Sequence, residues 1–308
     1  MSSMQQQKQR TLAGMYKLRD WVREENLDFH KLSMNTHPAA MHLIAEEPKR
    51  AWWTWLSANP AAMEILLWHT DKIDWSGLSR NPAPEAIQLL REHRSLIDWR
   101  EFSKNRSPEA VDMMIKNIRK VSWDNLFENP AATNPILYSQ EIVLHELANL
   151  AANPEMTHVV REHMSEFLAS CENDEDAETL FWYNLSCNPA AIDILEKYPE
   201  KIEWYELSQL PEAMHMIEKK LRFGFRNFLI NGLSQNPAAI DKLERLYKRG
   251  VVDWSNLSTN PAIFEYDYAA MRAEKEDLHM EMMAVFWQPE NVVVMMECDD
   301  DYTTVLNL

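Results

Sequence analysis

A segment of about 24 residues recurs along most of this 308-residue chain. A typical copy, residues 56–62, has an apolar residue, a serine, one variable residue, Asn-Pro and two alanines. The leading apolar residues are Leu32, Leu56, Leu78, Phe102, Leu126, Leu150, Leu185, Leu207, Leu233 and Leu257. Three positions before them stand Phe29, Trp53, Trp75, Trp99, Trp123, Leu147, Trp182, Trp204, Ile230 and Trp254. Two markers that keep register predict a repeat fold.

The copy at 188–208 shows why each unit is expected to form two helical elements. Asn188 is a strong N-cap, and Pro189 fits the first turn of a helix. We expect this helix to end at Pro199 after about ten residues. A single turn should follow, in which an acidic residue caps a Trp-x-x-Leu segment and the geometry is α or 3₁₀.

Helices this short are not stable alone in water, so each unit must bury its apolar stripe against its neighbours. The predicted fold is therefore all-α. We expect a right-handed α-solenoid of about ten short helix–turn repeats with divergent terminal caps. Units packed at the usual distance between helices would extend the array to roughly 90 Å.

The repeat pattern divides the chain into three predicted parts. Residues 1–26 form an N-terminal arm or cap, 27–264 the repeat array, and 265–308 a divergent C-terminal cap. Within the last part, 266–286 is predicted as a long helix, and 292–296 as a strand or a buried helix turn.

Two departures from the repeat are candidates for binding. The insertion at 165–181 is acidic, and its alternative interpretation is a tolerated surface loop. The segment 219–231 alternates basic and aromatic residues. Those aromatics could stack on a partner or belong to the core of a distorted repeat.

Composition restricts the function further. A net charge of −17 argues against nonspecific nucleic-acid binding. The chain has no apolar run of the roughly 20 residues that a membrane span needs, which predicts a soluble protein. Cys171, Cys187 and Cys298 cannot all pair and have no metal-ligand spacing, so we expect a reducing intracellular environment.

We identify no catalytic, cofactor-binding or metal-binding residue in the sequence. The segment starting at His145-Glu146 resembles a zinc-protease helix, but Asn149 replaces the second histidine. His158 and His163 are five apart and do not share a helix face. The repeated tryptophans and asparagines are interpreted as packing and capping residues, and the chain is not expected to be an enzyme.

The repeated unit, clearest at 73–82 and 252–261, resembles a repeat found in proteins of large DNA viruses that infect algae and amoebae. It is more distantly similar to leucine-rich variant repeats, which alternate an α-helix with a 3₁₀ helix. The resemblance covers about residues 27–264 and implies a viral origin more than a particular role.

Our main hypothesis is a structural scaffold, a minor capsid or inner-shell component that sits in the virion and is made in the host cytoplasm. Its partners would be proteins: capsid subunits, other virion proteins or further copies of this chain. The alternative is an adaptor in the host cytoplasm that holds a host or viral protein, as ankyrin-type arrays do.

Overall fold

The computed structural model describes residues 15–132, 146–171, 174–222 and 227–286. These residues are mostly helical, as predicted, and they contain a single two-stranded sheet. By its internal contacts the chain divides into two compact units. One is residues 18–264, and the other combines residues 1–17 with 265–308.

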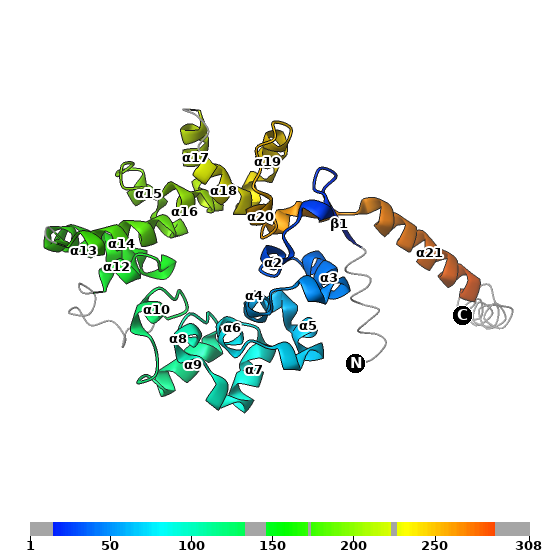
Figure 1. Ribbon diagram of the computed structural model, residues 1–308, viewed down its shortest axis with the longest axis horizontal. Helices are drawn as coiled ribbons and strands as arrows, with labels where there is room; N and C mark the ends of the chain where they lie inside the picture. The colour runs from blue at the N-terminus through cyan, green and yellow to red at the C-terminus, as the bar shows by residue number, and fades with distance from the viewer. Residues whose placement is uncertain (1–14, 133–145, 172–173, 223–226, 287–308) are drawn as a thin grey trace, which may run out of the picture. The chain divides into compact units, whose positions relative to one another are not determined.

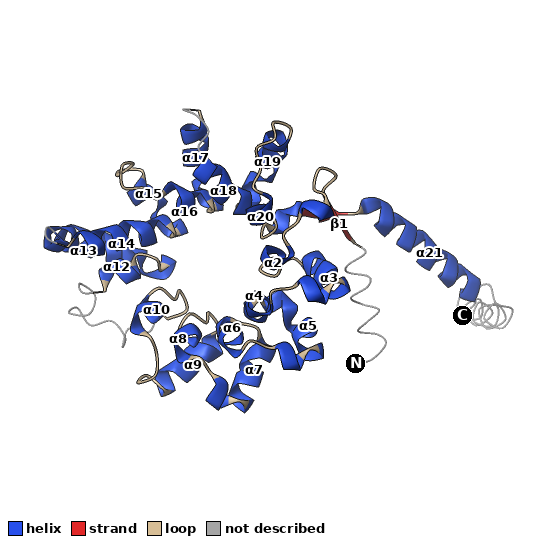
Figure 2. Cartoon of the chain, viewed as in Figure 1, coloured by secondary structure: helices blue, strands red, loops and turns tan. Residues whose placement is uncertain are grey.

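The unit 18–264 contains two rows of helices, shown in Figures 1 and 2. We call the row that holds the Trp-x-x-Leu segments the Trp row. Its members are α2 (Phe29–Leu32), α4 (Trp53–Ala58), α6 (Trp75–Arg80), α8 (Trp99–Phe102), α10 (Trp123–Phe127), α12 (Leu147–Leu150), α14 (Glu175–Ser186), α16 (Trp204–Ser208), α18 (Asn227–Gln235) and α20 (Trp254–Leu257).

The second row, the Pro row, follows the proline of each repeat. Its members are α3 (Pro38–Glu46), α5 (Met63–Trp68), α7 (Pro84–Glu92), α9 (Pro108–Lys116), α13 (Thr157–Ser170), α15 (Ile192–Leu195), α17 (Met214–Leu221) and α19 (Ile240–Tyr247). Short 3₁₀ turns precede most of them: η3 (Pro60–Ala62), η7 (Pro154–Met156), η9 (Pro189–Ala191), η10 (Pro211–Ala213) and η11 (Pro237–Ala239). A further such turn, η12 (Pro261–Ile263), leads into a strand.

The predicted caps are present, and a 3₁₀ turn that the sequence did not predict follows several of the asparagine caps. The Asp98 carboxylate accepts from the backbone N–H groups of Arg100 and Glu101, and the Asn188 side chain accepts from Ala190. The Trp-x-x-Leu element is α-helical, whereas the Pro-Ala segment is the 3₁₀ turn. A proline directly after the cap has no N–H to contribute, and the tighter turn then leads into the α-helix. The helix that we expected to end at Pro199 ends at Leu195.

Asparagine side chains also join one repeat to the next. Nδ2 of Asn81 donates to the carbonyls of Ser57 at 2.9 Å and Asn59 at 3.0 Å. The same pair of bonds is made by Asn59, Asn105, Asn129, Asn153, Asn236 and Asn260. Asn188 donates instead to the Ala151 carbonyl and the Thr157 hydroxyl. We call this series the asparagine ladder, and Leu210 stands where its next member would be.

A second ladder uses the serine of each Leu-Ser pair. The Ser79 hydroxyl donates to the Trp75 carbonyl in its own helix and accepts from the backbone N–H of Asp98 in the next repeat. Equivalent bonds to the following repeat are made by Ser33, Ser57, Ser103 and Ser186. The serines and asparagines are buried, and these bonds satisfy polar groups that would otherwise be costly to bury.

Both ladders continue from the last repeat to the first. Asn35 donates to the carbonyls of Ser258 at 2.9 Å and Asn260 at 3.1 Å, while Ser258 accepts from the N–H of Asp28. Figure 1 shows α20 beside α2. The unit 18–264 is therefore a closed ring of stacked repeats. Our expectation that the units extend in an open array was wrong, because the first and last repeats stack on each other.

Residues just before the first repeat cover the last one. The backbone N–H of Arg19 donates to the Ile263 carbonyl at 2.9 Å, and its Nε donates to Ala262 at 2.9 Å. The Trp21 ring packs on Tyr247 and Trp254 at centroid distances of 5.6 and 6.2 Å. These contacts add to the closure of the ring.

The strands β1 (Tyr16–Leu18) and β2 (Phe264–Tyr266) pair with each other, and α21 (Tyr268–Phe286) confirms the predicted long helix. Tyr16 and Tyr266 stack at 4.7 Å. The segment 292–296 lies outside the described residues.

Candidate binding surface

Two tryptophans in the second repeat depart from the repeat pattern. Trp52 occupies the N-cap position of α4, where Asp28, Asp74, Asp98 and Asp253 cap the equivalent helices, and its side chain makes no cap hydrogen bond. Its side chain is 45% exposed. The ring stacks on Trp55, with centroids 5.1 Å apart and planes inclined at 20°. A capping carboxylate has been replaced by a large exposed aromatic.

Side chains of the first repeat extend this aromatic pair. The imidazole of His30 meets the Trp52 ring edge-on at 5.0 Å, and Nζ of Lys31 lies 4.8 Å from the Trp55 ring centroid. Met34 is 43% exposed. We call these five side chains, His30, Lys31, Met34, Trp52 and Trp55, the aromatic cluster.

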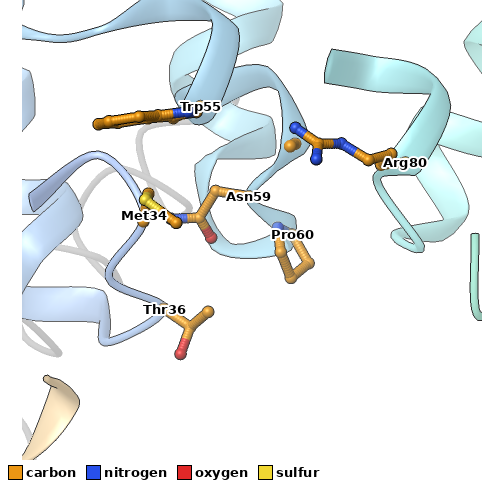
Figure 3. Close-up of a pocket in the computed structure, with 7 residues that line it drawn as sticks. Met34, Thr36, Trp55, Asn59, Pro60 and Arg80 are labelled. Carbon is orange, nitrogen blue, oxygen red and sulfur yellow. The ribbon is translucent and has the colours of Figure 1, made fainter. Parts of the chain in front are cut away.

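A pocket of about 270 Å³ borders the aromatic cluster. Its lining comes from the loop after α2, from α4 and η3, and from the end of α6: Met34, Thr36, Trp55, Ala58, Asn59, Pro60 and Arg80. Figure 3 shows Trp55 on one side, Thr36 and Pro60 on the opposite side, and the Arg80 guanidinium reaching in from α6. The lining is thus mostly apolar with one cationic group.

Arg80 belongs to a short row of charges. Its Nε lies 3.1 Å from Oε2 of Glu101, and Nζ of Lys104 lies 3.7 Å from Oε1 of the same carboxylate. Nε and Oε2 are buried, yet the geometry between them is not that of a hydrogen bond. The pair is an ion contact without a directed bond, a weaker arrangement than the bidentate contact that arginine can make with a carboxylate.

A second cluster of reactive side chains lies further round the ring. Burial, followed by the nearby charge of Glu206, raises the pKa of the Cys187 thiol to about 12. The same two causes raise the pKa of Tyr183 to about 12. A nucleophilic cysteine needs a lowered pKa, which a neighbouring base or cation supplies. These neighbours act in the opposite direction, so Cys187 is not activated as a nucleophile.

The tryptophans that mark the repeat pack against the end of the same repeat. Trp53 and Trp75 meet His69 and His93 edge-on at 5.4 and 5.1 Å. Nζ of Lys220 lies 4.4 Å from the Trp204 ring centroid. These contacts are the packing role that we assigned to the repeated tryptophans.

The insertion at 165–181 and the segment 219–231, which the sequence singled out, make no described contact with the aromatic cluster. Most of the acidic insertion is helical, since 165–170 ends α13 and 175–181 begins α14. In the basic and aromatic segment, Phe223, Phe225 and Arg226 lie outside the described residues, as does His145. The signal for the aromatic cluster was present but missed: Trp52 breaks the pattern of acidic caps.

Among the described residues, no three histidine, cysteine or carboxylate side chains are grouped to hold a metal ion. No helix in the described part of the chain is long and apolar enough to cross a membrane. No protein-family model, curated protein or solved structure matches this chain.

Proposed function

We propose that this protein is a non-enzymatic scaffold that binds a protein partner through the aromatic cluster and the adjoining pocket. The stacked pair of Trp52 and Trp55 carries the proposal, because one of these rings replaces a stabilising cap and remains 45% exposed. Tryptophan and arginine are the side chains most enriched among those that dominate the binding energy of protein interfaces. An exposed apolar cluster rimmed by polar groups is typical of an interaction site.

Closure of the ring favours the adaptor hypothesis over a rod that bridges larger subunits. In a ring every repeat stacks on two neighbouring repeats, so none offers a free stacking face to a second partner. A role in the capsid or inner shell of a large DNA virus remains our prediction from the resemblance of the repeat, with the host cytoplasm as the alternative location. Mass spectrometry of purified particles tests it, and absence of the protein would refute it.

We further propose that the ring is a right-handed α-solenoid of about ten repeats. The number of repeats is supported by the series of leading apolar residues, which starts at Leu32 and ends at Leu257. An experimental structure by electron cryo-microscopy would give both the hand and the count.

A quantitative pull-down with matched variants tests the binding function. The double variant combines Trp52→Asp with Trp55→Asn. Other repeats already have these residue types at the same positions, as Asp98 and Asn125. The new aspartate should restore a cap hydrogen bond worth about 1 kcal/mol, so the double variant should fold at least as stably as the wild type. The control is Trp68→Ala, which removes a tryptophan that is 60% exposed on α5.

We expect a stoichiometric protein partner that copurifies with the wild type and with Trp68→Ala but not with the double variant. Equal recovery of every partner by the double variant would refute the proposed surface. A thermal unfolding scan of each variant separates loss of binding from loss of fold.

A further inference from the structure

We propose that the aromatic cluster and pocket recognise an acidic linear segment of the partner, with one aromatic or aliphatic side chain in the pocket and a flanking carboxylate on Arg80. The inference rests on the proposed function and names the chemistry of its partner. It follows from the size of the pocket, the character of its lining and the charges around it.

The pocket is small and is suited to a single side chain. Sites for small molecules and cofactors usually have volumes of about 300–1,000 Å³, whereas this pocket has about 270 Å³. Met34, Trp55, Ala58 and Pro60 give it apolar walls. An aromatic side chain of the partner can pack against Trp55, which lines the pocket.

The Asn59 side chain contributes no free polar group to the pocket. Its amide donates to Ser33 and Asn35, and its Oδ1 accepts from the N–H of Ala61. The occupant must therefore be apolar where it meets this wall, and Arg80 supplies the strongest polar contact in the lining.

The charges select an acidic partner. Two cations border the pocket, Arg80 in its lining and Lys31 over the Trp55 ring, and none of the lining residues is acidic, although the whole chain carries −17. A local excess of positive charge on an acidic protein attracts an acidic segment and orients it. The undirected contact of Arg80 with Glu101 leaves the guanidinium able to improve its geometry with a second carboxylate.

Fluorescence anisotropy with labelled pentapeptides tests the inference on the full chain. The probe has a central phenylalanine flanked on each side by two aspartates. Three comparison probes change one property each: lysines replace the aspartates, serine replaces the phenylalanine, or a short oligothymidine replaces the peptide. Oligothymidine is included because stacked aromatics beside cations also bind single-stranded nucleic acid.

We expect saturable binding of the acidic phenylalanine peptide with a Kd below roughly 100 µM. Arg80→Gln and Trp55→Asn should each weaken it at least tenfold, since Gln235 and Asn125 occupy the equivalent positions elsewhere in the ring. Trp68→Ala should change it by less than twofold. The lysine and serine peptides and oligothymidine should bind at least tenfold more weakly than the acidic phenylalanine peptide.

Absence of saturable binding, equal binding of the lysine peptide or tighter binding of oligothymidine would overturn the inference. So would an unchanged Kd for Arg80→Gln. These outcomes are distinguishable from failure of the proposed function. If the Trp52 and Trp55 double variant loses a copurifying protein while the acidic peptide does not bind, the docking surface stands and only its preference for acidic segments is wrong.

Discussion

At the scale of single residues, buried polar side chains hold the repeats in register. The serine and asparagine of each Leu-Ser-x-Asn motif are buried, and their hydrogen bonds cross to the neighbouring repeat. The cap role of the asparagines could be predicted, because Asn before Pro is a local signal. The cross-repeat bonds could not, because they depend on which carbonyls the neighbouring repeat presents, although two polar positions that recur beside buried leucines were a usable hint.

Asn105→Ala should destabilise the protein strongly. Its side chain donates to Ser79 and Asn81 at 2.9 and 2.8 Å and accepts from the Ser107 N–H at 3.0 Å. Loss of a buried asparagine that makes these bonds should lower the free energy of unfolding by about 2–4 kcal/mol. Denaturant unfolding measures the change. Asn125→Ala is the control, since it removes one exposed bond to Arg100 and should cost under about 1 kcal/mol; equal losses in the two variants would contradict the ladder.

Glu128 is a half-buried carboxyl that should make stability depend on pH. Burial raises its pKa above the usual value, and the charge of Lys104 opposes the shift only in part. The folded protein therefore keeps this proton at pH values where the unfolded chain has lost it, so the contribution of Glu128 to stability falls as pH rises.

Glu128→Gln should accordingly raise the thermal unfolding midpoint at pH 7.5, by an amount that shrinks as the pH falls toward about 4. Glu109→Gln is a control of opposite sign, because a hydrogen bond from Ser107 lowers the pKa of Glu109. If the Glu128 variant were less stable than the wild type at pH 7.5 and equal at low pH, the burial argument would be wrong.

At the scale of helices and turns, the sequence predicted that both rows of helices exist, but it predicted their geometry less well. The Trp-x-x-Leu turn was left open between α and 3₁₀ because a four-residue element has too few backbone hydrogen bonds for its sequence to favour either form. Close approach of Trp-row helices at a glycine was also not predicted. It occurs where a glycine faces the preceding helix, at Gly77 and Gly232.

Gly77→Ala tests this close approach between α4 and α6. An added Cβ would lie 2.3 Å from the carbonyl oxygen of Thr54 and 3.1 Å from Cβ of Ser57, so the two helices would have to separate. We expect a loss of about 1–3 kcal/mol from overpacking. Alanine is the better helix former by about 1 kcal/mol, so a stabilised variant in denaturant unfolding would show that the helices do not pack this closely.

At the scale of the whole unit 18–264, closure of the stacked repeats into a ring could not be predicted from the sequence. Curvature in a stack of repeats arises from a small rotation per repeat, and errors of a few degrees accumulate along the array. The leading residues, their spacing and the caps are compatible with an open or a closed arrangement. The aromatic cluster was overlooked for a related reason: a repeat consensus draws attention to what recurs, whereas Trp52 and Trp55 matter because they do not.

Closure is the central claim, and a matched pair of crosslinks tests it most directly. The Ser76 hydroxyl donates to the Asp98 carboxylate of the next repeat at 2.8 Å, and the Ser255 hydroxyl donates to Asp28 at the same distance. Ser76→Cys with Asp98→Cys therefore reports ordinary neighbours, and Ser255→Cys with Asp28→Cys reports the closing contact. Both pairs are placed in a chain with its own three cysteines replaced.

A short bismaleimide is added to dilute protein, and the intramolecular links are counted by mass spectrometry. We predict that both pairs link with similar yield in the folded protein, and that in denaturant the Ser255 and Asp28 pair, which lies 227 residues apart in sequence, loses most of its link. A linked Ser76 and Asp98 pair beside an unlinked Ser255 and Asp28 pair would mean that the array is open, and the ring would be wrong.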